Sequence, residues 1–252
     1  MNKVLEVSVD SVASALTAIA GGATRLELCA NAIIGGTTPS LFLFQEIRKL
    51  SNIPIFVLIR PRFGDFLYSG VEFEIMKQEV IAFRDCGANG IVIGMLLPDG
   101  NLDVERLKEL KDIAYNEMNV TLHRAFDLCS DPLKALKQCI EMEFDTILTS
   151  GQKNNALDGL ELIDRLLEES REQIEILVGS GVNARVIQEF LTKTSATSFH
   201  MSGKIEVESK MIYRNDDVSM GFGDMNEYSL WYADSERIKA AVSALSPNEK
   251  YL

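Results

Sequence analysis

Short apolar segments recur along the chain, and each is followed by a longer stretch whose apolar residues repeat with helical spacing. The starts of these segments lie roughly 20 to 36 residues apart, the length of one strand, one crossover helix and two loops. The pattern predicts eight strands, at 4–9, 25–29, 55–60, 90–94, 120–123, 146–149, 176–179 and 198–201. It also predicts a last helix over 226–245.

Alternation within the predicted strands separates an apolar face from a polar one, because successive side chains of a strand point to opposite sides. In the first strand Leu5 and Val7 oppose Glu6, and in the second Leu26 opposes Glu27. If the apolar faces meet the helices, the polar faces converge on one interior. The residues placed there are Glu6, Ser8, Glu27, Cys29, Arg60, His123, Thr149 and His200.

This polar set decides between two architectures that alternate strands and helices. A doubly wound open sheet is covered by helices on both faces, so its strands tend to be apolar throughout. A barrel can turn polar near the carboxyl ends of its strands, where the sites of such folds lie. Two carboxylates, an arginine and both histidines are costly to bury in an ordinary core. We therefore predict a single (β/α)8 TIM barrel domain over residues 1–252, with a site at its mouth.

Charge and composition restrict the partners. The chain has 25 basic and 37 acidic residues and a net charge of -12, which disfavours nucleic acid and anionic lipid. The amino terminus lacks the apolar core of a signal peptide, and the run from Ile53 to Ile59 is far shorter than the roughly 20 residues of a membrane span. We predict a cytoplasmic protein with no membrane partner, whose four separated cysteines are free thiols.

Two charged motifs follow predicted strands. In RPRFGDFLYS, Arg60 and Arg62 are candidates for binding an anion, since guanidinium groups grip carboxylate or phosphate; a structural clamp with Asp65 is the alternative. In HRAFD, His123 is a candidate acid or base, and a structurally satisfied histidine is the alternative. Arg124 beside it is a further candidate anion ligand.

Two glycine-rich loops follow the sixth and seventh predicted strands. Ser150 with Gly151, and Gly179 with Gly181, could present backbone N–H groups to a phosphate, although any tight turn also uses glycine. Motifs for dinucleotide binding, nucleotide hydrolysis, zincins and serine hydrolases are absent from the sequence.

Several motifs together resemble the CutC family of copper-homeostasis proteins along nearly the whole chain. They are LEVSVDS, RLELCANAIIGGTTPS, IRPRFGDFLYS, LHRAFD, ILTSGQ, VGSGV and MIYRN. The resemblance implies a cytoplasmic (β/α)8 barrel, linked to copper(I) and often a homodimer. Carried over by motif, the implied functional positions are Cys29, Arg60, Arg62, Asp65, His123, Arg124, Asp127 and Gly151. Family members commonly carry cysteine where this chain has Ser8, so half of the implied thiolate pair for copper(I) is replaced by a hydroxyl.

Two functions follow from these residues. The first is copper homeostasis, with Cys29 as a metal ligand. The alternative is an enzyme of isomerase, lyase or hydrolase type, acting on a small anionic or phosphorylated metabolite. In it Arg60 and Arg62 hold the anion, and His123 transfers protons with Glu6 or Glu27. A self-satisfied salt-bridge network in a scaffold protein is a third possibility.

Overall fold

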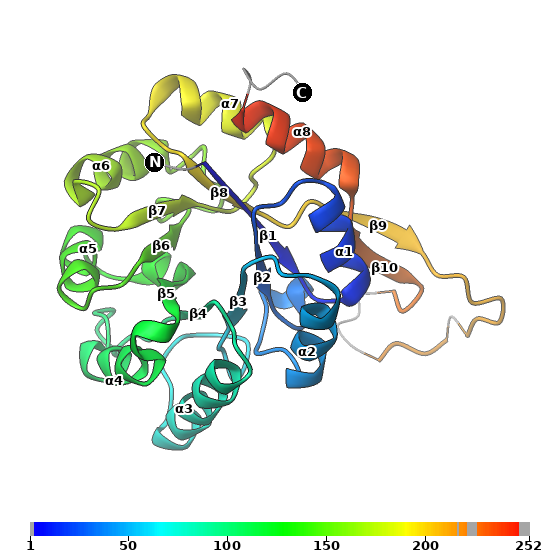
Figure 1. Cartoon of the computed structure of the whole chain (residues 1–252), viewed down its shortest axis with the longest axis horizontal. Helices are drawn as coiled ribbons and strands as arrows, with labels where there is room; N and C mark the ends of the chain where they lie inside the picture. Colours follow the sequence, from blue (N-terminus) through cyan, green and yellow to red (C-terminus); the bar gives the residue numbers. More distant parts are fainter. Residues whose placement is uncertain (1–2, 216, 221–225, 247–252) are drawn as a thin grey trace.

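A computed structural model describes residues 3–215, 217–220 and 226–246. Eight parallel strands close into a barrel in sequence order, and helices surround it (Figure 1), which confirms the predicted (β/α)8 fold. The barrel strands are β1 (Val4–Val9), β2 (Arg25–Leu28), β3 (Ile55–Leu58), β4 (Gly90–Ile93), β5 (Asn119–Leu122), β6 (Thr146–Thr149), β7 (Glu175–Val178) and β8 (Ser198–Met201).

The helices begin largely where short polar side chains can cap them. Asp103, Asp131 and Asn183 each accept a backbone N–H of the first helical turn, and Pro132 occupies the first position after Asp131. The helices are α1 (Val12–Ala20), α2 (Leu41–Leu50), α3 (Gly70–Asp85), α4 (Val104–Ala114), α5 (Pro132–Glu141), α6 (Leu160–Ser170), α7 (Ala184–Lys193) and α8 (Ser235–Leu245). In the described part of the chain, none has the length and apolar character that crossing a membrane requires.

Several strands end one or two residues earlier than the alternation predicts. Cys29, Arg60, Gly94, His123 and Gly179 lie just beyond the carboxyl ends of their strands. Cys29, His123 and Gly179 still donate one backbone N–H each to the neighbouring strand. The backbone of Arg60 bonds to Thr38 in the preceding loop instead. The polar residues of these strands therefore lie at the rim of the barrel.

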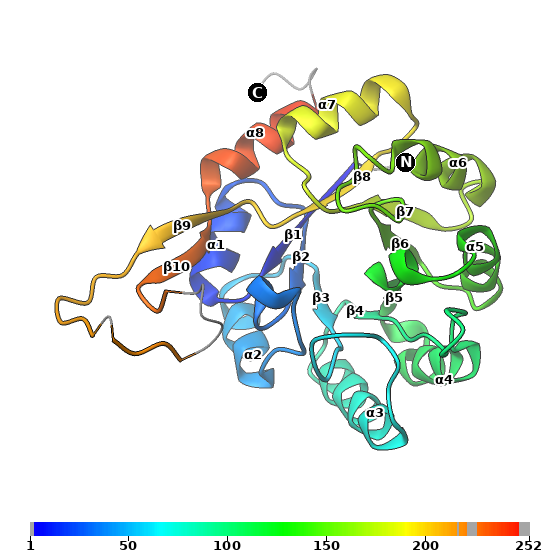
Figure 2. The same cartoon turned by 180° about the vertical axis from the view of Figure 1, so that it is seen from behind.

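The segment after β8 differs from the prediction of one long last helix. It forms an antiparallel hairpin of β9 (Lys204–Glu208) and β10 (Ser229–Ala233), which projects beside the barrel (Figures 1 and 2). The predicted helix over 226–245 is wrong in its first half, because Trp231 and its neighbours favour a strand. Asp234 then caps α8 by accepting the backbone N–H of Arg237.

Candidate functional site in the barrel mouth

Strand register brings an ionic cluster together at one level of the barrel. Glu6 on β1 is the register partner of Arg25 on β2 and of His200 on β8. Its carboxylate binds Arg25 Nε at 2.5 Å and His200 Nδ1 at 2.8 Å, and Arg25 also reaches Glu175 at 3.3 Å. Three adjacent strands thus hold one fully buried carboxylate between two basic side chains.

The charges in this cluster determine its protonation. Burial alone would raise the pKa of Glu6, but Arg25 and His200 outweigh it and lower that pKa to about 2. Burial opposes a charge on His200, but the carboxylates of Glu27 and Glu6 raise its pKa above the ordinary value. Glu6 therefore stays ionised, and His200 is favoured in its protonated form when no metal is bound.

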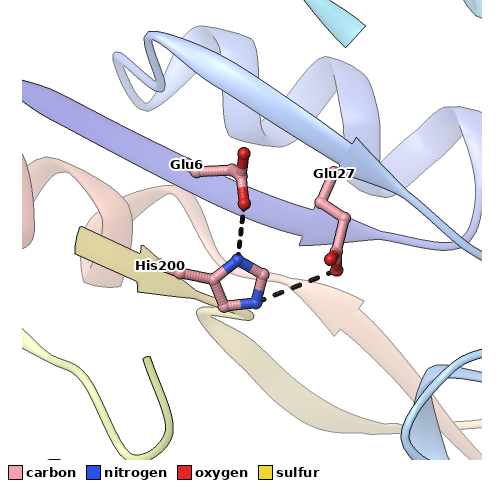
Figure 3. A group of neighbouring side chains, drawn as sticks. All are labelled: Glu6, Glu27 and His200. Atoms are coloured by element: carbon pink, nitrogen blue, oxygen red, sulfur yellow. Dashed lines mark hydrogen bonds and ion pairs between the residues drawn. The ribbon is translucent and has the colours of Figure 1, made fainter. Parts of the chain in front are cut away.

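Ser8 and Glu27 lie nearer the rim, two residues further along β1 and β2, and are also register partners. Ser8 donates its hydroxyl to Glu27 Oε2 at 2.9 Å. His200 Nε2 lies 3.9 Å from the same oxygen, and its Nδ1 faces Glu6 (Figure 3). The Sγ atom of Cys29 lies 3.7 Å from Ser8 Oγ and 3.7 Å from the carbonyl oxygen of Val9. Glu6, Glu27 and His200 place ligand atoms within 4.8 Å of one another and could hold a metal ion. We therefore call the four side chains of Ser8, Glu27, Cys29 and His200 the metal wall.

Protonation in the metal wall is governed by burial. Burial raises the pKa of Glu27, and the charge on His200 opposes this rise only in part. The pKa of Cys29 rises to about 12, first through burial and then through the nearby charge of Glu27. Cys29 is therefore a neutral thiol at physiological pH until a ligand displaces its proton.

A cavity of about 380 Å³ opens between this wall and the opposite rim of the barrel. It is unusual for an acidic protein, because Glu27 is the one carboxylate among its lining residues, whereas Arg60, Arg124 and Lys204 are basic. Its remaining lining consists of Ser8, Cys29, Ala32, Gly35, Gly36, Leu58, Phe66, His123, Leu148, Ser180, Gly181, Val182, His200, Met201 and Ser202. The field inside it favours an anion more than the net charge of -12 suggests.

Arg60 is a buried cation held by neutral groups. Its guanidinium donates to the carbonyl oxygens of Gly35, Gly36 and Gly64 at 2.8 to 3.1 Å and stacks over Phe66 at 4.9 Å. Among the described residues, no carboxylate lies within 4 Å of it, and Nε has no hydrogen-bond partner. Its charge is therefore neutralised by no side chain around it.

His123 is a buried histidine with a defined tautomer. Its Nδ1 accepts the backbone N–H of Ala125 at 3.0 Å, so a neutral ring carries its proton on Nε2. Nε2 has no partner in the part of the chain that the structure describes. Burial, reinforced by the charge on Arg60, lowers the pKa of His123 to about 3. This geometry favours a hydrogen-bond donor over the general base that the sequence suggested.

Arg62 lies outside the cavity lining, although it belongs to the same loop as Arg60. It binds Asp65 at 2.9 Å and Glu72 at 2.6 Å, and it also donates to the carbonyl oxygen of Leu67 at 2.8 Å. Both carboxylates come from the chain immediately after it. The contacts favour the structural clamp over the anion-binding role for Arg62.

Asp127 binds the loop after β6 and makes no contact with His123. It accepts the backbone N–H groups of Ser150 and Gln152 at 3.0 to 3.1 Å and pairs with Arg124 at 2.7 Å. The Gly151 N–H is bonded to Thr149 Oγ1 at 2.9 Å. The donors that the sequence offered to a phosphate at Ser150 and Gly151 are thus already used within the protein, while Arg124 still lines the cavity.

In the loop after β7, only one of the two glycines predicted to bind a phosphate lines the cavity. Gly179 donates its backbone N–H to the carbonyl oxygen of Thr149 at 2.9 Å and is not part of the cavity lining, whereas Gly181 is. Sequence reasoning missed two cations of the site, Arg25 and Lys204. Alternation places Arg25 on the polar face of Glu27, two residues before it, but the predicted site did not include it.

The sequence comparisons identify the family. A profile of the CutC family matches residues 3–205, which cover all eight barrel strands and the first residues of β9. The chain belongs to the CutC family. CutC relatives are similar over nearly their full lengths: a human copper homeostasis protein cutC homolog is 42% identical over 97% of this chain and 89% of its own.

Two further CutC proteins show the same relationship. A CutC family protein of Vibrio campbellii is 38% identical over 98% of this chain and all of its own. A crystal structure of a CutC protein from Streptococcus agalactiae superimposes with a TM-score of 0.75 and 29% identity, covering 79% of this chain and 98% of its own. The CutC barrel is therefore shared with proteins named for copper homeostasis.

Proposed function

We propose that this protein acts in copper homeostasis by binding a copper(I) ion at Cys29 in the mouth of the barrel. The observation that carries the proposal is the position of this thiol: of the four cysteines, Cys29 alone lines the cavity. It lies against Ser8 and in the same wall as His200. A cytoplasmic location is part of the proposal, because a reducing compartment keeps the thiol free.

The donor set of the metal wall suits copper(I) with one thiolate. Cys29 supplies soft sulfur and His200 supplies imidazole, whereas the hydroxyl of Ser8 is a hard donor that does not replace a second thiolate. Glu6 holds Nδ1 of His200 at 2.8 Å and leaves Nε2 on the side of Glu27. A carboxylate that fixes a histidine ring in this way is a common support of metal-binding imidazoles.

Binding must displace the proton of Cys29, whose pKa is about 12. Affinity for copper(I) is therefore expected to rise with pH, since metal and proton compete for the same sulfur. Replacing Ser8 by cysteine would restore a second thiol 3.7 Å or so from the first, judged by the present oxygen-to-sulfur distance of 3.7 Å.

The test is an anaerobic competition titration of copper(I) against a chromophoric chelator. We expect Cys29→Ser to weaken binding by about tenfold or more, His200→Gln to weaken it as well, and Ser8→Cys to strengthen it. Cys86→Ser is the matched control, because Cys86 is a half-buried thiol at the end of α3, outside the cavity. Equal affinity of wild type and Cys29→Ser would refute the proposal.

A further inference from the structure

The cavity has more room and more positive charge than a copper ion needs. Its volume of about 380 Å³ falls within the range of roughly 300–1,000 Å³ that is typical of small-molecule sites. The metal wall occupies the side formed by β1, β2 and β8. The loops after β3, which pairs with β2, and after β5 contribute Arg60 and His123 to the rim.

Arg60 is the first sign of a ligand on that side. A buried charge is costly unless it is paired with an opposite charge. Arg60 is held by three carbonyl oxygens, which orient its guanidinium but leave its net charge in place. By contrast, the arginines nearby are neutralised: Arg25 by Glu6, Arg62 by Asp65 and Glu72, and Arg124 by Asp127. A carboxylate of a ligand would supply the missing partner.

His123 is the second sign, and it is independent of the first. Its ring is fixed by the bond from Ala125 to Nδ1, and the Nε2–H donor is buried without a partner among the described residues. Leaving a buried donor unpaired costs about 1–3 kcal/mol. Because the ring stays neutral, it offers a hydrogen bond without a second positive charge.

Both groups lie against the ring of Phe66. The guanidinium of Arg60 lies 4.9 Å from the centroid of the Phe66 ring, and the ring of His123 lies 4.7 Å from the same centroid. The charge of Arg60 is close enough to act on the imidazole. Arg60, Phe66 and His123 all line the same cavity, so one small molecule in it would lie near both groups.

We propose that the mouth also binds a small 2-oxo or 2-hydroxy acid, with its carboxylate on Arg60 and its adjacent oxygen accepting from His123 Nε2. The carboxylate matches the planar guanidinium, and the oxo or hydroxyl oxygen matches a neutral donor. Phe66 and Leu58 supply the apolar contact for the carbon skeleton. None of the residues in this proposed site is one of the proposed copper ligands.

Isothermal titration calorimetry on metal-free protein tests the inference, with pyruvate, lactate and inorganic phosphate as probes. We expect pyruvate or lactate to bind, and Arg60→Gln to weaken that binding by about tenfold or more. Arg62→Gln is the matched control. This arginine lies in the same loop and stacks over Tyr68 at 5.1 Å, but it is already paired with carboxylates.

His123→Asn provides a second variant in case Arg60→Gln disturbs the loops that it binds. Asparagine can keep an acceptor for the Ala125 N–H while removing the Nε2 donor. This variant should weaken the binding of pyruvate and lactate. It should leave the binding of acetate unaffected, because acetate lacks the oxo or hydroxyl oxygen on the carbon next to its carboxylate. The proposal would be overturned if neither pyruvate nor lactate binds, or if Arg60→Gln and His123→Asn bind them as tightly as wild type does. Tighter binding of phosphate than of both acids would overturn it as well. Since copper is absent, none of these outcomes bears on Cys29.

Discussion

Removing the charge of Glu6 should destabilise the barrel strongly, although Glu6 is only one of many carboxylates. Its side chain is fully buried between Arg25 and His200. The pKa of Glu6 falls from 4.5 to about 2 in the folded protein, which at about 1.4 kcal/mol for each tenfold change corresponds to about 3 kcal/mol. Breaking a buried ion pair from one side costs about 3–5 kcal/mol. We expect Glu6→Gln to lie near the lower figure, because Glu175 still pairs with Arg25.

Urea unfolding of metal-free protein, followed by circular dichroism, measures this loss. The matched control is Glu46→Gln. Glu46 binds Lys49 at 2.6 Å, close to the distance between Glu6 and Arg25, but the side chains of Glu46 and Lys49 are both more than half exposed. Exposed pairs contribute little, so about 0.5 kcal/mol or less is expected for the control. In thermal unfolding, a loss of about 3 kcal/mol corresponds to a fall of roughly 6–12 °C in a chain of this size.

The pH dependence gives a second criterion for the same variant. Because the folded pKa of Glu6 lies below the unfolded value of 4.5, its stabilisation is fully present above pH 4.5 and is lost as the pH falls toward 2. The difference between wild type and Glu6→Gln should therefore shrink over that interval. A loss as small as that of Glu46→Gln, or a difference that does not change with pH, would refute the reasoning.

Three further predictions concern other parts of the molecule. The His123 imidazole should remain neutral on acidification until about pH 3, observed by NMR; a titration near pH 6.5 would contradict its burial beside Arg60. Gly94→Ala should lower the free energy of unfolding by about 1–3 kcal/mol and weaken the proposed binding of pyruvate or lactate, because the methyl group of the alanine would overlap the ring of His123. Normal stability and binding would show that the ring can move. The homodimer implied by the family resemblance is expected to bury the projecting hairpin segment, since Ile212 and Tyr213 are largely exposed. Ile212→Asp should then produce monomers in sedimentation velocity, and an unchanged dimer would place the interface elsewhere.

The fold and the polar interior could be predicted because they depend on periodicity alone. Alternation assigns Glu6, Glu27 and His200 to one face, and this polar face, together with eight repeats of strand and helix, favours a closed barrel over an open sheet. The hairpin of β9 and β10 could not be predicted in the same way. Its two strands are separated by 20 residues and pair with each other outside the barrel, so nothing in the repeat indicates their partner.

The roles of the site residues depend on pairing, which alternation does not determine. Arg60 and Arg62 are two residues apart and look equivalent in the sequence, yet Asp65 and Glu72 neutralise only Arg62. The same applies to Asp127, which the family resemblance implies as a functional position. Its place on the short 3₁₀ helix Arg124–Leu128 brings it to the loop after β6, where it binds Ser150.

These pairings leave two sides of the mouth with different net charges. At the metal wall, the carboxylate of Glu27 and that of Glu6 beneath it lie next to His200, so the charges there balance one another. Cys29 and the imidazole of His200 are the ligands proposed for a cation. At the rim after β3, Arg60 has no such balance and lies beside a neutral donor. Copper(I) at Cys29 would take the place of the thiol proton, so the sulfur with its metal carries no more charge than the thiol did. The unbalanced charge of Arg60 would therefore remain whether or not copper is bound, and an organic anion could offset it in either state.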